Sequence, residues 1–275
     1  MLRLRSVAPL VLGITVDAAG AARPVHQPFL TVAGREGVGY VLVQLDEDGV
    51  IRRFDERLGE GGTVVPTLAG QLARRLGVPV EYGLVQFALG PDFGYVPLRD
   101  VLALQAAGDG AALARQFGGK VVMLGTVLPY EDQLKLPVKL AAWDRDRETT
   151  HGVRIHAQQM RSLLEGRVVR PLDGTIALLL VCAASLAWWL RPAAAGALLL
   201  GLALLSMLAL EVLLLARGAH VPLAWPALAG LLAASARAAL EAWFAMREKR
   251  WLRAAFAGFV SPAVLGEILG GRLQP

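Results

Sequence analysis

The sequence predicts an α/β domain over residues 1–172, three transmembrane helices over residues 173–244 and a short helical linker over residues 245–275. Two features support this fold class. Strand-like and helix-like patterns alternate along the first domain, which is typical of a layered α/β fold. Long apolar runs then follow one another, and the mean hydropathy of the 275-residue chain is +0.49. That value is above the range usual for soluble proteins and indicates that part of the chain lies in lipid.

The elements of the first domain follow from local patterns. Short apolar runs bounded by turn residues predict strands at residues 10–16, 38–45, 84–89 and 121–124. Apolar residues that recur every three or four positions predict helices at residues 67–76, 98–106, 111–116 and 155–164. Asp48-Gly49 between apolar runs predicts a hairpin turn, because a calcium loop needs a longer ligand series. The first 22 residues also resemble a secretion signal, and both interpretations of residues 10–16 stay open.

Three apolar stretches predict membrane-spanning helices at residues 173–191, 193–216 and 221–244. About 20 apolar residues are needed to cross the hydrocarbon core, and each stretch approaches or reaches that length. The connections between them are only a few residues long, which predicts antiparallel hairpins. The alternative is a set of buried helices in a large soluble core. Long uncharged runs in series favour the membrane interpretation.

Three ionisable residues lie within these spans or near their ends: Glu211, Arg237 and Glu241. Such groups are costly in lipid and are often functional. Arg237 and Glu241 are four positions apart on one helix, so they can pair locally. We therefore expect local pairing of these two residues rather than ion conduction.

The distribution of cationic residues predicts the orientation. Four cations follow the third span closely: Arg247, Lys249, Arg250 and Arg253. Cytoplasmic flanks are enriched in Lys and Arg, so residues 245–275 are expected in the cytoplasm. After three crossings, residues 1–172 would then be extracytoplasmic. Membrane lipid is accordingly one expected partner.

No catalytic group, cofactor or metal site is predicted for this chain. The single cysteine, Cys182, excludes an intrachain disulfide and a multi-cysteine zinc site. His151 and His156 are five positions apart and, even with Asp132, lack the spacing of a metal site. The net charge is +5 without a dense basic patch, so no nucleic-acid partner is expected.

Asp132 and His156 are the candidate ligand-binding residues. His156 lies at the start of the helix predicted at residues 155–164, directly after the strand-like residues 152–154. Ligands of open α/β sheets favour the crevice at strand ends, where both side chains would face a pocket. The alternative is a structural histidine hydrogen-bonded near the helix start, and the pattern favours this alternative.

Five motifs occur in a characteristic order. They are Asp-Glu-Asp-Gly-Val-Ile-Arg-Arg at 46–53, Gly-Lys-Val-Val-Met-Leu-Gly-Thr at 119–126, Asp132 followed by Leu-Pro at 136–137, His-Gly-Val-Arg-Ile-His-Ala at 151–157, and Leu-Leu-Glu-Gly-Arg at 163–167. In this order they resemble the CHASE type 2 (CHASE2) family of extracytoplasmic sensory modules in bacterial receptors. The resemblance covers about residues 9–170 and implies a multi-pass protein of the bacterial inner (plasma) membrane. Family members normally begin with a transmembrane helix and a strand-rich segment, so the resemblance implies an N-terminally truncated member.

The C-terminal tail carries a second resemblance. Residues 256–269, Phe-Ala-Gly-Phe-Val-Ser-Pro-Ala-Val-Leu-Gly-Glu-Ile-Leu, resemble the linker that leads into class III adenylate/guanylate cyclase domains. Ser261 as N-cap and Pro262 as first helical residue predict a helix at 262–269. The resemblance implies a sensor that relays an extracytoplasmic signal to a cyclase domain absent from this chain, which is itself no enzyme. The same sensor coupled to a histidine or Ser/Thr kinase, and a small membrane transporter, are the alternatives.

The predicted partners are an unknown extracytoplasmic ligand and a second copy of the chain. Class III cyclases build their active sites between two catalytic domains, so the resemblance implies a homodimer. The larger apolar residues of segment 240–259 recur every three or four positions and predict an amphipathic stripe that would suit such a dimer. The alternative is a helix that lies against its own bundle or the headgroups.

Overall fold

A computed structural model describes residues 8–17, 20–87, 89–137, 149–171, 175, 179, 182–183 and 193–256. The chain divides into two compact units, residues 1–170 and residues 171–275.

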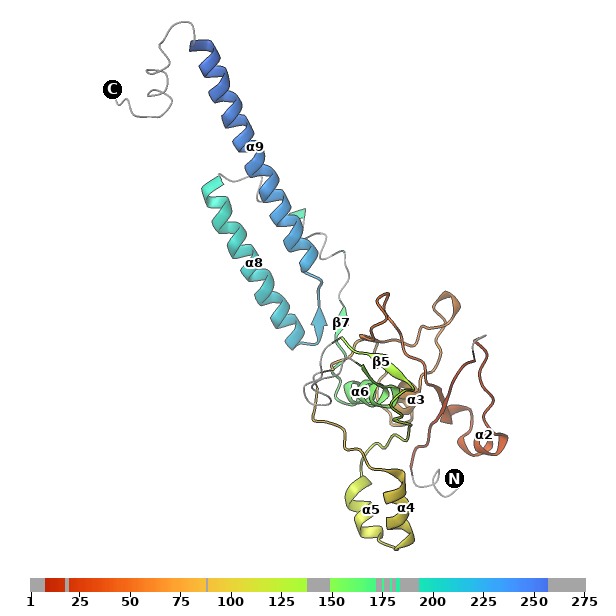
Figure 1. Cartoon of the computed structure of the whole chain (residues 1–275). Helices are drawn as coiled ribbons and strands as arrows, with labels where there is room; N and C mark the ends of the chain where they lie inside the picture. The colour runs from red at the N-terminus through yellow and green to blue at the C-terminus, as the bar shows by residue number, and fades with distance from the viewer. Residues whose placement is uncertain are drawn as a thin grey trace. The chain divides into compact units, whose positions relative to one another are not determined.

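The first unit is a mixed α/β domain, as predicted (Figure 1). Its described elements are β1 (Leu12–Ile14), α2 (Gln27–Ala33), β2 (Val38–Tyr40), β3 (Arg53–Phe54), α3 (Leu68–Arg75), β4 (Gly83–Leu84), α4 (Leu98–Ala106), α5 (Gly110–Phe117), β5 (Gln133–Lys135), β6 (Thr149–His151), α6 (Gly152–Leu164) and, at its end, β7 (Arg170–Pro171), with short 3-10 turns at Arg35–Gly37 and Glu60–Gly62. The strands of the domain pair in twos. β1 pairs with β2 in parallel, whereas β3 with β4 and β5 with β6 are antiparallel.

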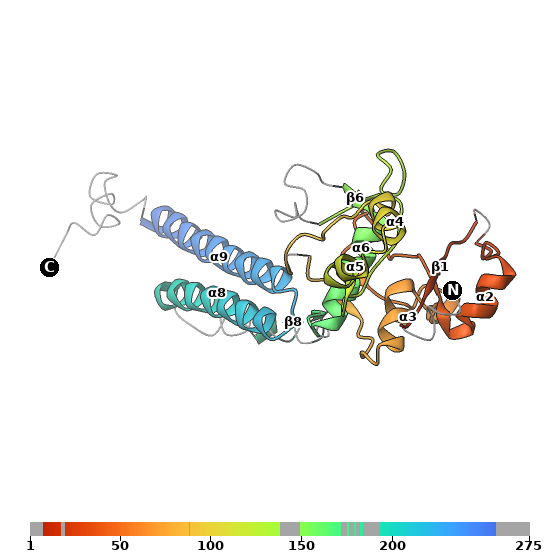
Figure 2. The ribbon, with the colours of Figure 1, turned by 90° about the horizontal axis from the view of Figure 1, so that it is seen from below.

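The core of this unit lies where α3 packs against α6, next to β3 and β4 (Figure 2). Thr67 begins α3 as its N-cap, and its hydroxyl accepts a hydrogen bond from the Gly70 N–H at 3.1 Å. An N-cap of this kind satisfies a backbone donor that the helix itself leaves free. The buried apolar residues of the core are Ile51, Phe54, Ala69, Ala73, Val85, Phe87, Ile155, Met160, Leu163 and Val168.

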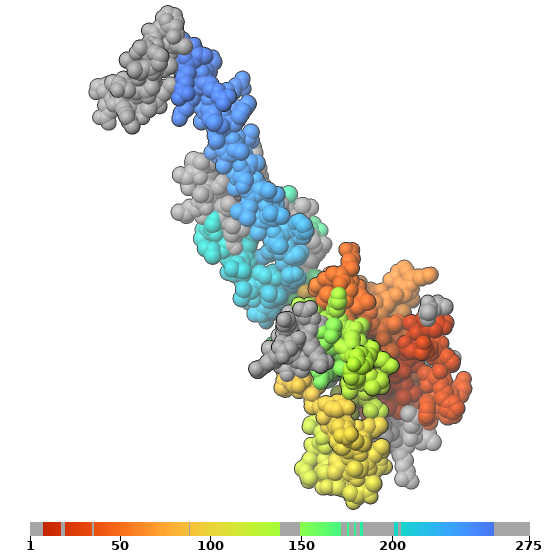
Figure 3. Space-filling view, viewed as in Figure 1, coloured from red at the N-terminus to blue at the C-terminus, as the bar shows by residue number. Residues whose placement is uncertain are grey.

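Several predicted elements are confirmed. Helix α4 has the predicted bounds, and α3 and α5 agree with their predicted ranges to within one residue at each end. Helices α4 and α5 form a projection of the first unit, drawn in yellow in Figure 3. The predicted turn is also present: the Gly49 N–H donates to the Asp46 carbonyl oxygen at 2.9 Å, and Gly49 has a φ of 74°. Glycine suits this left-handed conformation because it has no Cβ.

Other predictions were wrong in position. Residues 152–154 are the first turn of α6, not a strand. Residues 121–124 form no ladder among the described residues, and Val122 and Leu124 are 57% and 80% exposed. The strand predicted at 84–89 ends at Leu84, and further along the Leu89 N–H turns back to the Gln86 carbonyl oxygen. Helix α2 and strands β3, β5 and β6 were not predicted, since they are too short to show a clear period.

The second unit contains α8 (Ala193–Ala216), β8 (Ala219–His220) and α9 (Ala224–Phe256), and α8 packs against α9 (Figures 1 and 2). Helix α8 has the bounds of the second predicted span. Helix α9 starts three residues after the start of the third predicted span and continues beyond its end to Phe256. Among the described residues, one helix, Ala224–Ala255, is long and apolar enough to cross a membrane, and the part of α8 from Leu205 to Ala216 is a shorter apolar stretch.

The remaining secondary-structure predictions for this half of the chain concern residues that lie wholly or mostly outside the described ones. The first predicted span, residues 173–191, is described at only a few positions. The linker beyond Phe256, with the helix predicted at 262–269, lies outside the described residues.

Candidate functional site

Asp132 is held against the start of α6. One of its carboxylate oxygens, Oδ2, accepts a hydrogen bond from the Gly152 N–H at 2.9 Å, and its carbonyl oxygen lies 3.2 Å from the same nitrogen. Asp132 has a φ of 55°, the left-handed conformation that aspartate tolerates better than most residues. The carboxylate thus satisfies the first free donor of α6 and complements the positive end of the helix.

Gly152 has no room for a side chain. A Cβ at this position would lie 2.4 Å from Asp132 Oδ2. This close approach explains the His-Gly pair of the motif at 151–157: the glycine admits the capping carboxylate. It also explains why α6 begins at Gly152 rather than at Ile155, because Asp132 completes the first turn.

His156 lies in the second turn of α6 and is 5% exposed. Its Nδ1 is 3.3 Å from Gln159 Oε1. Burial lowers the pKa of His156, and the hydrogen bond to Gln159 and the charge of Asp132 oppose that shift less strongly. The imidazole is therefore neutral at physiological pH.

The structure thus brings the two predicted site residues to the same end of α6, close enough for the Asp132 charge to act on His156. The described contacts of each residue are structural, since Asp132 caps the helix and His156 lies in the interior of the unit. Ligand binding by this pair stays a prediction. Among the described residues, no three His, Cys, Asp or Glu side chains are arranged to hold a metal ion.

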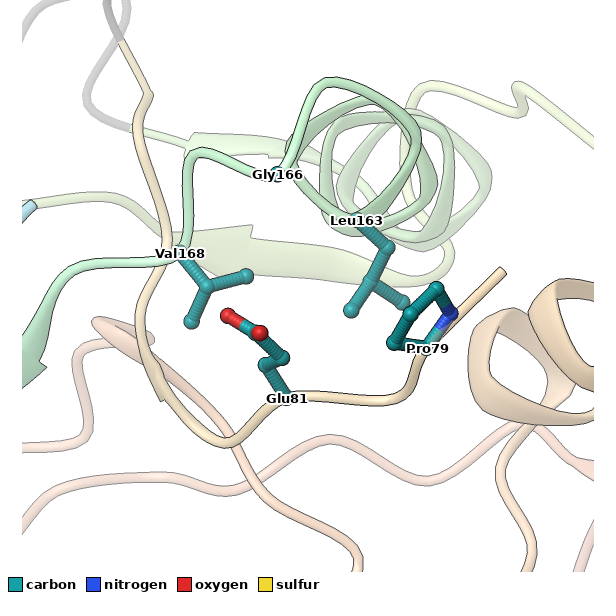
Figure 4. Close-up of a pocket in the computed structure, with 5 residues that line it drawn as sticks. All are labelled: Pro79, Glu81, Leu163, Gly166 and Val168. Atoms are coloured by element: carbon teal, nitrogen blue, oxygen red, sulfur yellow. The ribbon is translucent and has the colours of Figure 1, made fainter.

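A small cavity lies near the opposite end of α6 (Figure 4). It has a volume of about 50 Å³ and is lined by Pro79, Glu81, Leu163, Gly166 and Val168. The Glu81 carboxylate points toward the side chains of Leu163 and Val168, and it also forms an ion pair with Arg170. Sites for small organic molecules usually enclose about 300–1,000 Å³, so this cavity suits water rather than an organic ligand.

A buried carboxylate that the sequence did not single out anchors α3. Glu56 is 0% exposed, and its Oε1 accepts hydrogen bonds from the Thr67 N–H at 2.6 Å and the Thr67 hydroxyl at 3.0 Å. Its Oε2 forms an ion pair with Arg74. A Cβ on Gly70 would lie 2.2 Å from Glu56 Oε1, so this glycine leaves room for the carboxylate. In the sequence Glu56 stands in an Asp-Glu-Arg run typical of a solvated surface, and no spacing rule connects it to Thr67.

Two polar residues of α6 hold the segment that follows β4. The Gln158 amide donates to the carbonyl oxygens of Gln86 and Leu89, and Arg161 Nη1 donates to those of Leu89 and Pro91. Backbone carbonyls without strand partners are satisfied in this way. Helix α6 therefore organises this loop as well as the core.

Ion pairs within the acidic-basic motif at 46–53 connect the two sides of the hairpin turn. Arg52 forms ion pairs with Asp46 at 2.9 Å and with Asp48 at 2.7 Å. The hydrogen bond from Arg52 lowers the pKa of Asp48 to about 2. The alternating charges of the motif therefore fix a turn, which agrees with the interpretation that excluded calcium.

The comparisons with known proteins add one finding. The chain matches the model of the CHASE2 domain over residues 5–206. No curated protein and no solved structure matches the chain significantly. The matched range includes the whole of the described α/β unit and extends into α8.

Proposed function

The chain belongs to the CHASE2 domain family, and from this premise we propose that it is the sensory and transmembrane part of a receptor that controls a class III adenylate or guanylate cyclase. CHASE2 is an extracytoplasmic, non-catalytic sensory domain of signalling receptors. The family match is the observation that carries the sensory role. The cyclase effector rests on the resemblance of residues 256–269 to a cyclase linker.

Membrane insertion of the second unit is supported by its exposed apolar side chains. Leu205, Leu208 and Val212 of α8 and Leu232 of α9 are each more than 60% exposed. Apolar surface of this extent is not stable in water and indicates a lipid environment. We propose spans at 173–191, 193–216 and 221–244 in the bacterial inner membrane.

The proposed orientation places residues 1–172 outside the cytoplasm and the C-terminus inside. Its support is the group of cations in the last turns of α9, which comprises Arg247, Lys249, Arg250 and Arg253. Cations are retained on the cytoplasmic side during insertion. The sensory role of the family requires the same orientation.

Helix α9 is the route by which a signal would reach the effector. It is one continuous helix from Ala224 to Phe256, the residue at which the linker pattern starts. A rotation or shift at its first turns would therefore be transmitted to the linker without an intervening loop. The linker pattern favours a cyclase over a histidine or Ser/Thr kinase, and the internal ion pair between Arg237 and Glu241, at 2.7 Å, gives no support to a transporter.

A homodimer is the proposed assembly. Trp243, Phe244 and Trp251 of α9 are 51%, 56% and 68% exposed in the single chain, so the apolar stripe is open to a second copy. In a Cys182→Ala background, single cysteines placed from 240 to 259 would be oxidised in membranes. Disulfide yields that peak every three or four positions are expected for a parallel pair of helices. A flat profile would count against the dimer.

A chimera tests the effector. The catalytic domain of a characterised class III cyclase is joined to residue 275, and cyclic nucleotide formation is measured in membranes. Insertion of one to four alanines after Phe256 should change the activity with a period of about 3.6 residues, because each residue rotates the linker by about 100°. The same insertions in a Gly-Ser spacer after residue 275 serve as the control. Activity that is indifferent to both sets of insertions would exclude coupling through α9. A matched histidine-kinase chimera that alone shows the period would favour the kinase alternative.

A further inference from the structure

One charged residue of the apolar helix α8 has a partner outside its own helix. Glu211 lies five residues before the end of α8, and its Oε1 is 2.5 Å from His220 Nδ1 in β8. Its other oxygen, Oε2, is 3.4 Å from the backbone nitrogen of Val221. The side chains of Glu211 and His220 are 17% and 33% exposed. A carboxylate in an apolar helix thus connects the helix to the turn between α8 and α9.

The turn itself is tight. The N–H groups of Arg217 and Gly218 donate to the carbonyl oxygens of Leu214 and Leu215, and Gly218 has a φ of 75°. Val221 is 2% exposed and follows His220 directly. Loss of the contact from Glu211 to His220 would remove the described side-chain link between α8 and the turn that precedes α9.

The protonation state of His220 decides the charge of this pair. A protonated imidazole beside an ionised carboxylate makes an ion pair without net charge. A neutral imidazole can still donate one hydrogen bond, but it leaves a carboxylate charge in an apolar helix, which is costly. Charge-assisted hydrogen bonds are also the stronger ones.

Few charged residues occur in the described elements on either side of the pair. Among the described residues of α8, β8 and the connecting turn, Arg217 carries the remaining charge. The first titratable group of α9 is Arg237, more than three turns beyond its start, and it pairs with Glu241.

We propose that Glu211 and His220 form a proton-binding site that locks the turn between α8 and α9. The lock tightens as the medium is acidified, because a protonated imidazole makes the charge-assisted contact with the Glu211 carboxylate. Under the proposed function the turn faces the extracytoplasmic side, and this placement alone rests on that function. The site would make the start of the signalling helix α9 respond to external pH.

Amide hydrogen exchange tests the site in the full chain reconstituted in lipid nanodiscs. Protection of residues 214–224 is compared at about pH 6 and about pH 8 after correction for the intrinsic exchange rate. We expect about tenfold higher protection at the lower pH, since a charge-assisted hydrogen bond replaces a weaker one. His220→Gln keeps a donor near Glu211 but cannot titrate, so its protection should be equal at the two pH values. Glu211→Gln should abolish the difference as well.

His26→Gln is the matched control, because His26 is an exposed histidine of the first unit. This variant should keep the wild-type difference. Equal protection of the wild type at both pH values, or a difference that persists in His220→Gln, would overturn the proposal. The measurement needs no effector, so a failure of the cyclase chimera leaves it unaffected. In sealed vesicles of known orientation, a response to acidification of the cytoplasmic side alone would overturn the proposed topology while supporting the proton site.

Discussion

Replacement of the buried Glu56 by alanine tests whether this carboxylate anchors α3. The change removes the acceptor of the Thr67 N–H and hydroxyl and the partner of Arg74. Each buried donor left without a partner costs about 1–3 kcal/mol. Arg74 is 37% exposed and can return to water, so the lost ion pair adds only about 1 kcal/mol. The expected loss is at least about 3 kcal/mol, a large part of the stability of an ordinary domain.

The assay is amide hydrogen exchange of α3 in the full chain in nanodiscs. A loss of about 3 kcal/mol corresponds to a decrease in protection of roughly two orders of magnitude. Glu56→Gln should lie between wild type and alanine, because its amide oxygen still accepts from Thr67. Glu60→Ala, the same change at an exposed position four residues later, should alter protection by less than about threefold. Protection of α3 in Glu56→Ala equal to that in Glu60→Ala would refute the anchoring role.

Three further predictions concern the cap of α6, the buried histidine and the topology. Gly152→Ala should lower the free energy of unfolding of the sensory unit by about 2–4 kcal/mol, because the added Cβ meets the Asp132 carboxylate. In an Asp132→Ala background the same change should cost much less. If the losses of the two single variants simply add in the double variant, the clash is contradicted. His156 is neutral in the fold and has a lowered pKa. Its contribution to stability is therefore complete above the ordinary histidine pKa of about 6.5 and is lost as the pH falls toward the lowered pKa of the folded state. The loss is at most about 1.4 kcal/mol per pH unit. His156→Gln should remove this part of the acid sensitivity in thermal melts between about pH 4 and 7, and an unchanged pH profile would show that another group is responsible. Alkaline phosphatase fused after Pro275 should be inactive and a fluorescent protein at the same place should be bright, whereas an active phosphatase would reverse the orientation.

The secondary structure of several segments could be predicted because the signals are local. Helix α4 was predicted with its observed bounds, and α3 was predicted from its periodicity to within one residue at each end. The turn at Gly49 followed from an Asp-Gly pair between apolar runs. The motifs in their order indicated the family that the match over residues 5–206 then showed.

The short strands and the unpaired segment could not be predicted in this way. A strand exists only where a second segment supplies hydrogen bonds, and residues 121–124 have the pattern of a strand but no ladder partner among the described residues. Conversely, β5 and β6 pair although neither has a marked hydrophobic period. Pairing is a property of two segments, so the hydrophobic pattern of one segment is insufficient to predict a strand.

The sequence by itself determined the division into an α/β part and an apolar part, the family and most helices, since composition, periodicity and capping act over a few neighbouring residues. Only the tertiary structure decided the roles of the polar side chains. Asp132 was singled out as a ligand contact and is found as the cap of α6, twenty positions away at Gly152. Glu56 was overlooked, and the partner of Glu211 was found only across the turn, at His220. A carboxylate acquires its role from the donors that folding brings within about 3 Å, and those donors are distant in the sequence.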